Sequence, residues 1–312
     1  MSIGVLVMAH GTPDTPEGIE AFYTRIRRGR PPTPELLAEL TGRYEAIGGT
    51  SPLTMRTRAQ VDGLGAALEA AAPGRFTVRL GTKYVQPTIE EAVADLSSLG
   101  VERVVGVVLT PHQSTMGSGE YFERARTAAA GAVPPLDLAE VPSWYRAPGL
   151  DEILALRTRH VLDGLEPAAR ARTAVFFTAH SLPQRVVAEG DPYPDQVAAS
   201  GAHIAALLDL DADPTVTWGT AWQSAGRTAD PWIGPDLLVE MDRVAAGGAT
   251  AVVVCPVGFV SDHLEVLYDL DIEARDRADV LGIAFARTPS LNDDPDFLAL
   301  LADVVRAAAD PA

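Results

Sequence analysis

The 312-residue sequence contains a single cysteine, Cys255. One cysteine permits no disulfide within the chain and cannot supply the four thiolates of an iron–sulfur cluster. A structural zinc site needs closely spaced Cys and His ligands, and the sequence has no such spacing. A metal bound by this chain is therefore expected on imidazole and carboxylate groups, which suit a borderline divalent ion such as Fe²⁺.

Long hydrophobic runs and basic charge are also scarce. The clearest apolar stretches, residues 3–9 and 251–259, are far shorter than the roughly 20 residues that cross a bilayer. The net charge of −17 argues against nucleic acid as a partner, because duplex binding requires clustered Lys and Arg. The sequence opens on neither a secretory leader nor an Arg-rich transit peptide. We expect a cytoplasmic monomer with no stable insertion in a membrane.

Apolar runs rich in β-branched residues alternate with helical patterns along the chain. Strands are predicted at residues 3–9, 76–82, 103–110, 136–141, 173–179, 215–220, 250–256 and 283–287. Helices are predicted at residues 57–72, 89–99, 120–130, 150–165, 196–208, 235–246 and 296–309. This alternation predicts an α/β fold with parallel sheets covered by helices on both faces. A length of 312 residues and 47% hydrophobic content favour two domains.

The two halves of the sequence repeat one pattern. Residues 5–13 (VLVMAHGTP) and 175–183 (VFFTAHSLP) are both apolar strands that end in Ala-His-x-x-Pro. Residues 107–112 and 252–257 are likewise strands that end in proline. We therefore predict two similar doubly wound, Rossmann-like domains, each with a four-stranded parallel sheet, that face each other across a central cleft.

The domain boundary is predicted near the Pro- and Gly-containing segment that follows residue 140. The N-terminal domain then comprises residues 1–145, and residues 146–295 form a C-terminal domain that carries the metal site. The last helix, residues 296–309, is predicted to pack back on the first domain.

A row of carboxylates follows the strand at 251–254. Glu265, Asp269 and Glu273 are spaced i, i+4 and i+8, so on a regular helix they share one face. His180 ends another predicted strand and would face this row, because strand ends border the ligand crevice of open parallel sheets. An imidazole and a carboxylate can bind a divalent metal and also accept protons. Asp269 and Glu273 fit a solvated acidic stripe equally well.

One class of substrate needs both a metal and proton acceptors. A tetrapyrrole loses two pyrrole protons as a divalent metal enters it, and its propionates require cations at the cleft mouth. Arg27, Arg43 and Lys83 are candidates for that role, because guanidinium groups bind carboxylates bidentately. The arginine cluster at residues 25–30 is also consistent with a solvated helix end that complements the helix dipole.

Six ordered motifs resemble the ferrochelatase family, most closely its Gram-positive coproporphyrin III ferrochelatases. They are residues 23–30 (YTRIRRGR), 43–53 (RYEAIGGTSPL), 179–183 (AHSLP), 190–196 (GDPYPDQ), 222–228 with 231–235 (WQSAGRT, PWIGP) and 256–269 (PVGFVSDHLEVLYD). The resemblance implies insertion of Fe²⁺ into coproporphyrin III to form coproheme in heme b biosynthesis. It also implies transient contact with a separate coproheme decarboxylase.

The same resemblance implies roles for single residues. His180 and Glu265 match the catalytic pair that binds metal and accepts protons, and Asp269 and Glu273 continue the carboxylate row by which metal approaches. The positions implied to contact the tetrapyrrole and its propionates are Arg27, Arg43, Tyr44, Ser51, Lys83 and Tyr121.

The chain departs from the family pattern at His10, where close relatives tend to carry a tyrosine that reaches the metal of the product. Because imidazole is a stronger neutral ligand for heme iron than a phenol, we hypothesise that His10 ligates product iron. A second departure concerns cysteine. Actinobacterial members often carry a [2Fe–2S] cluster, which this sequence excludes, so no tightly bound cofactor is expected and Fe²⁺ is a substrate.

Three other functions remain open from the sequence. The chain lacks the apolar lip expected of a protoporphyrin IX ferrochelatase, and its arginine cluster suits a substrate with four propionates. The smaller cobalt and sirohydrochlorin chelatases share paired strand-end histidines but fit residues 27–52 poorly. A non-catalytic heme or metal carrier would use the same cleft, with His10 and His180 as ligands. The sequence does not fix the selectivity for Fe²⁺ over later divalent metals.

Overall fold

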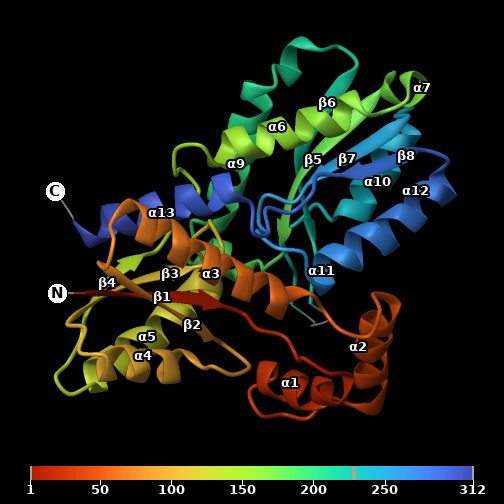
Figure 1. Ribbon diagram of the computed structural model, residues 1–312. Helices are drawn as coiled ribbons and strands as arrows, with labels where there is room; N and C mark the ends of the chain where they lie inside the picture. Colours follow the sequence, from red (N-terminus) through yellow and green to blue (C-terminus); the bar gives the residue numbers. More distant parts are fainter. Residues whose placement is uncertain (1, 227–229, 311–312) are drawn as a thin grey trace.

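The computed structural model, which describes residues 2–226 and 230–310, contains two parallel four-stranded sheets (Figure 1). The first has the order β2-β1-β3-β4 and the second the order β6-β5-β7-β8. The strands are β1 (Ile3–Ala9), β2 (Phe76–Thr82), β3 (Arg103–Val108), β4 (Asp137–Val141), β5 (Thr173–His180), β6 (Val216–Gln223), β7 (Ala251–Cys255) and β8 (Ala284–Arg287). The predicted strands are confirmed within a few residues. The matching strand orders confirm the predicted fold of two similar doubly wound halves.

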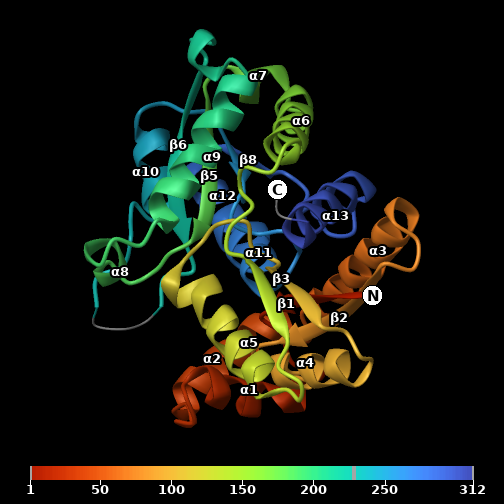
Figure 2. The same ribbon diagram turned by 90° about the vertical axis from the view of Figure 1, so that its left-hand side faces the viewer.

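Helices cover both faces of each sheet (Figures 1 and 2). The predicted helices are present as α3 (Leu53–Ala71), α4 (Ile89–Ser98), α5 (Glu120–Gly131), α6 (Leu150–Asp163), α9 (Tyr193–Leu207), α10 (Leu237–Ala246) and α13 (Pro295–Ala309). Those that the periodicity did not specify are α1 (Ile19–Ile26), α2 (Pro34–Ala46), α7 (Pro167–Arg170), α8 (Arg185–Ala188), α11 (Leu264–Leu267) and α12 (Arg275–Leu281). No helix in the described part of the chain has the length and apolar character needed to span a membrane.

Local signals in the sequence set several helix starts. Thr88 accepts a hydrogen bond from the backbone N–H of Glu91 at 3.2 Å, and the Glu91 carboxylate accepts one from the Thr88 N–H at 2.7 Å. This reciprocal capping box satisfies two otherwise unpaired donors at the start of α4. Asp294 caps α13 in a simpler way, by accepting a hydrogen bond from the Asp296 N–H at 2.9 Å.

The strands are apolar along their whole length because both sheet faces are buried. In β1, Val5 and Val7 join the cluster on one face of the sheet, whereas Leu6 and Met8 join the cluster on the other. All four side chains are fully buried. Near-continuous hydrophobic strands of this kind are characteristic of parallel sheets with helices on both sides.

The C-terminal helix α13 lies beside α3 of the first half of the chain (Figures 1 and 2). Phe297 of α13 is fully buried, and its ring lies 5.8 Å from that of Trp144 between centroids. These residues belong to one hydrophobic cluster that also contains Val175 and Phe177 of the second sheet. The two halves therefore share a continuous core. We propose a domain boundary after residue 145, with α13 packed on the first domain.

We predict that Phe297→Ala lowers the free energy of unfolding by about 3–5 kcal/mol, because it leaves a cavity in this shared core. Asp303→Ala on the same helix is the matched control, since the Asp303 side chain is 74% exposed and an exposed ion pair contributes little. Urea unfolding of both variants measures the difference. A loss below about 1 kcal/mol in Phe297→Ala would show that α13 contributes little to the core.

Candidate active site

Two adjoining cavities, of about 320 Å³ and 550 Å³, lie at the carboxyl ends of the two sheets. We call them the inner and outer cavity. They share His10, Leu53, His180, His263 and Glu265. In each sheet the strand order reverses beside the first strand of that half, and ligands of doubly wound folds bind at such switch points. His10 directly follows β1, and His180 is the last residue of β5.

The loop after β7 brings Glu265 to His180. Gly258 in this loop approaches the end of β5 so closely that an added Cβ would lie 2.5 Å from the Cβ of Ala179. Only glycine fits there without a backbone shift, so the close approach fixes the path of the loop. The chain then enters the short helix α11, whose first turn holds Glu265.

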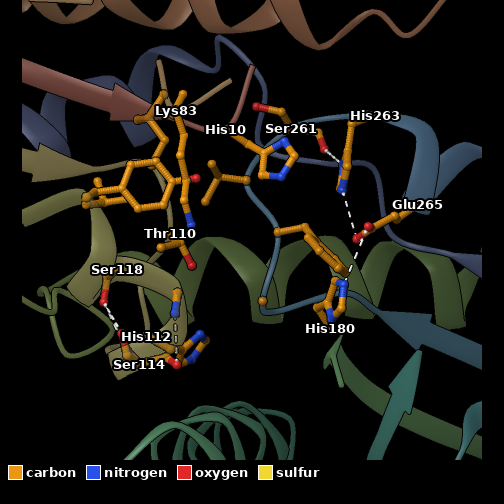
Figure 3. A pocket seen from close by; sticks show the side chains of 18 of the residues that line it. His10, Lys83, Thr110, His112, Ser114, Ser118, His180, Ser261, His263 and Glu265 are labelled. Atoms are coloured by element: carbon orange, nitrogen blue, oxygen red, sulfur yellow. Dashed lines mark hydrogen bonds and ion pairs between the residues drawn. The ribbon is translucent and has the colours of Figure 1, made fainter. Parts of the chain in front are cut away.

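Three histidines that line the cleft are anchored in the same way. The Nδ1 atoms of His10, His180 and His263 each lie within hydrogen-bonding distance of a backbone carbonyl. These carbonyls belong to Gly11, Ser181 and Ser261, respectively. A carbonyl only accepts, so each Nδ1 carries the proton, and in the neutral ring the lone pair is on Nε2. Three Nε2 atoms are thus left to face the cleft (Figure 3).

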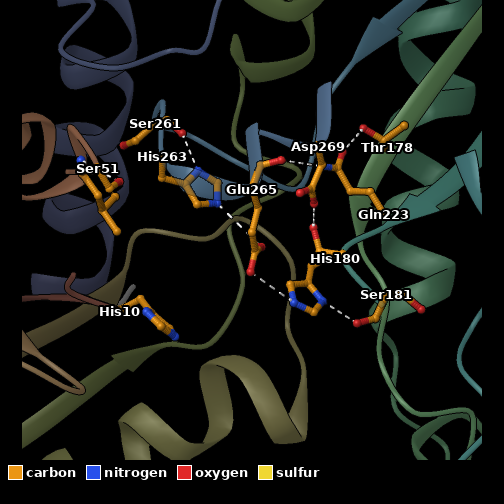
Figure 4. A network of polar contacts seen from close by, with 12 residues as sticks. His10, Ser51, Thr178, His180, Ser181, Gln223, Ser261, His263, Glu265 and Asp269 are labelled. Carbon is orange, nitrogen blue, oxygen red and sulfur yellow. Dashed lines mark hydrogen bonds and ion pairs between the residues drawn. The ribbon is translucent and has the colours of Figure 1, made fainter. Parts of the chain in front are cut away.

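Glu265 stands between two of these nitrogens (Figure 4). Its Oε1 lies 3.5 Å from His180 Nε2, and its Oε2 lies 3.7 Å from His263 Nε2. A carboxylate facing two nitrogen lone pairs is repelled unless a proton or a metal cation lies between them. The geometry of this group therefore selects for bound positive charge.

The pKa values reflect this arrangement. Burial lowers the pKa of His180, but the charge of Glu265 outweighs burial and raises the pKa of His180 to about 9. Burial raises the pKa of Glu265, yet the nearby His180 holds the pKa of this carboxyl well below its usual range. The two residues thus share one proton near neutral pH. Burial lowers the pKa of His10, which keeps the imidazole of His10 neutral and able to act as a ligand.

The prediction that the carboxylate row lies on one regular helix is wrong. A π-helical turn, Asp269–Ala274, follows α11, and the N–H of Glu273 donates to the carbonyl of Tyr268 at 2.9 Å, five residues back. Such turns are rare in proteins, and those that occur are often found at functional sites. Glu265, Asp269 and Glu273 nevertheless all line the outer cavity. Asp269 is buried, so it is no part of a solvated stripe, whereas Glu273 is exposed at the cavity mouth.

Asp269 is held by two neighbours. Its Oδ1 forms an ion pair with Arg43, and its Oδ2 accepts a hydrogen bond from the Ser224 hydroxyl. Burial raises the pKa of Asp269 to about 6, although Arg43 acts in the opposite direction. Within the described ranges, no group of three His, Cys, Asp or Glu side chains is arranged to hold a metal ion. The row is therefore a set of separate carboxylates.

Most of the residues that the family resemblance implies to contact the tetrapyrrole line one of the two cavities. Those of the outer cavity are Arg43, Tyr44 and Ser51, those of the inner cavity are Lys83 and Tyr121, and His10 lines both. Tyr44 and Tyr121 are largely buried, and Lys83 forms an ion pair with Glu120. Arg27 ends α1 next to the outer cavity without lining it, and its buried Nε has no acceptor among the described residues.

Sequence reasoning missed two side chains that support the pair. The Gln223 side chain donates to the backbone carbonyl of Glu265 at 2.9 Å, and the Tyr193 hydroxyl donates to the carbonyl of His180 at 3.1 Å. Both lie in quoted motifs, but their spacing gave no sign that they point at the site. His263, which lies in the motif at 256–269, contacts Glu265 as a third side chain of this group. Arg227 and Thr228 of the motif at 222–228 lie outside the described residues.

Comparison with known proteins adds independent evidence. Residues 2–309 match the profile of the Ferrochelatase family. A ferrochelatase of Herpetosiphon aurantiacus is 40% identical over 96% of this chain and 97% of its own length. The coproporphyrin III ferrochelatase of Bacillus mycoides is 40% identical over 97% of this chain and 96% of its own length.

Solved structures agree on the fold. The sirohydrochlorin chelatase SirB of Bacillus subtilis subspecies spizizenii superposes with a TM-score of 0.58 at 13% identity, covering 99% of this chain and 96% of that one. At that identity the likeness concerns the fold alone. The family match over almost the whole chain, together with the two relatives at 40% identity, shows that this chain belongs to the ferrochelatase family.

Proposed function

We propose that the chain inserts Fe²⁺ into coproporphyrin III and forms coproheme for heme b biosynthesis. The observation that carries this proposal is the His180–Glu265 pair, 3.5 Å apart at the point where the two cavities meet. Metal insertion into a tetrapyrrole needs a group that binds a cation and groups that accept protons, and this pair serves both needs. Relatives from several Bacillus species that are about 40% identical are named coproporphyrin III ferrochelatases, which supports this substrate.

The reaction exchanges two protons for one metal ion. As Fe²⁺ bonds to the four ring nitrogens, two pyrrole N–H bonds break and two protons leave, so the total charge is conserved. Because His180 and Glu265 already share one proton near neutral pH, that proton is proposed to leave to solvent, after which the imidazole and the carboxylate can accept the two protons from the ring. Asp269 and Glu273 extend from the pair toward the mouth of the outer cavity and are proposed to guide the metal.

Cations around the cleft fit the propionates of the substrate. Arg43 and Lys83 present positive charge in the outer and inner cavity, respectively. Arg27 stands beside the outer cavity with a buried Nε that has no partner among the residues that the structure describes, and an incoming carboxylate would satisfy it. Tyr44, Ser51 and Tyr121 supply further contacts for the macrocycle. Four propionates use this positive charge more fully than a less carboxylated porphyrin would.

His10 is proposed to ligate the iron of the product. Figure 4 shows His10 across the cleft from His180 and Glu265, and its Nδ1 is anchored on the carbonyl of Gly11 at 2.9 Å. The Nε2 lone pair of the neutral ring is left for an axial bond to heme iron. In this arrangement a macrocycle between the two histidines has a proton acceptor on one side and an iron ligand on the other.

The proposal extends to partners and location. We propose a cytoplasmic monomer that binds coproporphyrin III and Fe²⁺, contacts a coproheme decarboxylase transiently, and binds no nucleic acid. The chain's one cysteine, Cys255, is fully buried in β7, which supports the absence of a [2Fe–2S] cluster.

The decisive assay is anaerobic insertion of Fe²⁺ with coproporphyrin III and protoporphyrin IX offered separately. We expect faster turnover of coproporphyrin III, and a loss of about 100-fold or more in His180→Ala, because the ring supplies both a ligand and a proton acceptor. His160→Ala, on the exposed face of α6, is the control. Preference for protoporphyrin IX would refute the substrate, and binding without turnover would favour a carrier.

The shared proton predicts a titration that NMR can follow. The ring of His180 should titrate near pH 9 in the wild type, and this pKa should fall in Glu265→Gln, where burial is opposed only by the Ser181 carbonyl and the charge of Asp269. The raised pKa stabilises the fold fully below about pH 6.5, and this contribution is lost as the pH rises through about 9. Glu273→Gln is the matched control and should leave the titration near 9. Equal titrations in wild type and Glu265→Gln would contradict the pairing.

Loss of the proposed iron ligand should speed product release. We expect coproheme to dissociate at least about tenfold faster from His10→Ala than from the wild type, with a changed heme absorption spectrum. Tyr84→Phe is the control, because this ring packs on His10 at 4.7 Å but does not anchor it. Indistinguishable dissociation rates and spectra for His10→Ala and wild type would remove His10 from the role of ligand.

A further inference from the structure

Arg43 connects the two halves of the molecule across the cleft mouth. It lies in the last turn of α2, in the first half, and its Nη2 forms an ion pair with Asp269 of the π-helical turn in the second half. Its guanidinium also stacks on the ring of Tyr268, with 4.6 Å between Cζ and the ring centroid. The ion pair thus joins a cation at the porphyrin site to a carboxylate of the metal route.

The guanidinium of Arg43 uses little of its bonding capacity. It has five N–H donors in a planar fork, and the hydrogen bond to Asp269 engages Nη2. Its Nε is buried and has no acceptor within the described part of the chain. Arg43 lines the outer cavity, with 25% of its side chain exposed. A carboxylate that enters this cavity can engage the fork bidentately, which is the stronger mode of binding.

Asp269 is the opposite case, because both of its oxygens are engaged. Arg43 binds Oδ1 and the Ser224 hydroxyl binds Oδ2, and the side chain is only 7% exposed. A guanidinium against the carboxylate repels an approaching divalent cation and cancels much of the attraction of Asp269 for it. If Arg43 turns away, a buried carboxylate is left without a counter-charge, which is costly until a cation arrives.

We propose that Arg43 is exchanged between Asp269 and a carboxylate of the tetrapyrrole, so that tetrapyrrole binding releases Asp269 to attract the metal. This inference rests on the proposed function. It makes Asp269 a positioning residue for the metal and Arg43 the link between the two substrates. Because such coupling is reciprocal, a metal bound near Asp269 also favours transfer of Arg43 to the tetrapyrrole. The exchange favours binding of the tetrapyrrole before the metal.

The inner cavity offers a matched comparison. Lys83 there is a second cation assigned to the tetrapyrrole, and it pairs with Glu120, which lines neither cavity and lies outside the carboxylate row. Removing either cation should weaken tetrapyrrole binding. Only the loss of Arg43 should strengthen metal binding, since Glu120 has no part in the metal route. A purely structural role for Arg43 predicts weaker binding of both substrates.

The test is a titration of Co²⁺, as a stand-in for Fe²⁺, into protein without tetrapyrrole. Arg43→Gln should bind Co²⁺ about tenfold more tightly than the wild type, and coproporphyrin III more weakly. Lys83→Gln should bind coproporphyrin III more weakly with unchanged affinity for Co²⁺. Arg43→Lys, which keeps the cation, should bind Co²⁺ as the wild type does. Adding Asp269→Asn to Arg43→Gln should abolish the gain.

Equal or weaker Co²⁺ binding by folded Arg43→Gln would overturn the exchange. If that variant does not fold, the wild type provides the test: its Co²⁺ affinity should rise when an N-methylated coproporphyrin, whose blocked nitrogen hinders metal insertion, saturates the cleft. No rise would also overturn the exchange. Failure of coproporphyrin III to bind the wild type would instead refute the proposed substrate, while the Co²⁺ comparison of Arg43→Gln and wild type still reports on the ion pair.

Discussion

The site depends on one electrostatic constraint, which is that Glu265 faces the Nε2 atoms of His180 and His263. The anchoring of each ring through Nδ1 to a carbonyl directs its Nε2 atom at the carboxylate. Such a group is stable only with a cation inside it, either a proton or a metal ion. Proton and metal would therefore compete for the same place, so in the proposed reaction this group can bind the cation before insertion and accept protons after it.

The fold serves this constraint by repeating one unit. Each half places its first strand beside the point where the sheet order reverses, and each of these strands delivers a histidine, His10 or His180. The shared core, which runs from Val5 through Phe297 to Phe177, holds the halves together. The cleft between them is thus bounded by packed sheets, and its two sides are chemically different because only the second half adds the carboxylate row.

The strands could be predicted because hydrophobic periodicity is a local signal. The approach of Glu265 to His180 could be expected because β5 and β7 are parallel neighbours whose carboxyl ends meet at one edge of the sheet. The π-helical turn at Asp269–Ala274 could not, since i, i+4 and i+8 spacing fits a regular helix equally well. Nor does the sequence show that Arg43 pairs with Asp269, 226 residues away, because that contact exists only once both halves have folded. Propensity and spacing describe elements, whereas ion pairs across a cleft depend on how the elements meet.

That ion pair also bears on how the enzyme separates its two substrates. A divalent cation and a polyanionic porphyrin attract each other in solution. In the proposed exchange the cation requires the carboxylate of Asp269 and the porphyrin requires the guanidinium of Arg43, and these two groups are bound to each other in the ion pair. In the proposed exchange, the charge of Asp269 is compensated while Arg43 is bound to it. Once Arg43 moves to the porphyrin, Asp269 and Glu273 would add net negative charge beside the His180–Glu265 pair. Because charge interactions in a partly desolvated cleft are stronger than in water, displacement of one guanidinium would change the attraction of Asp269 for a cation more than it would at an exposed site.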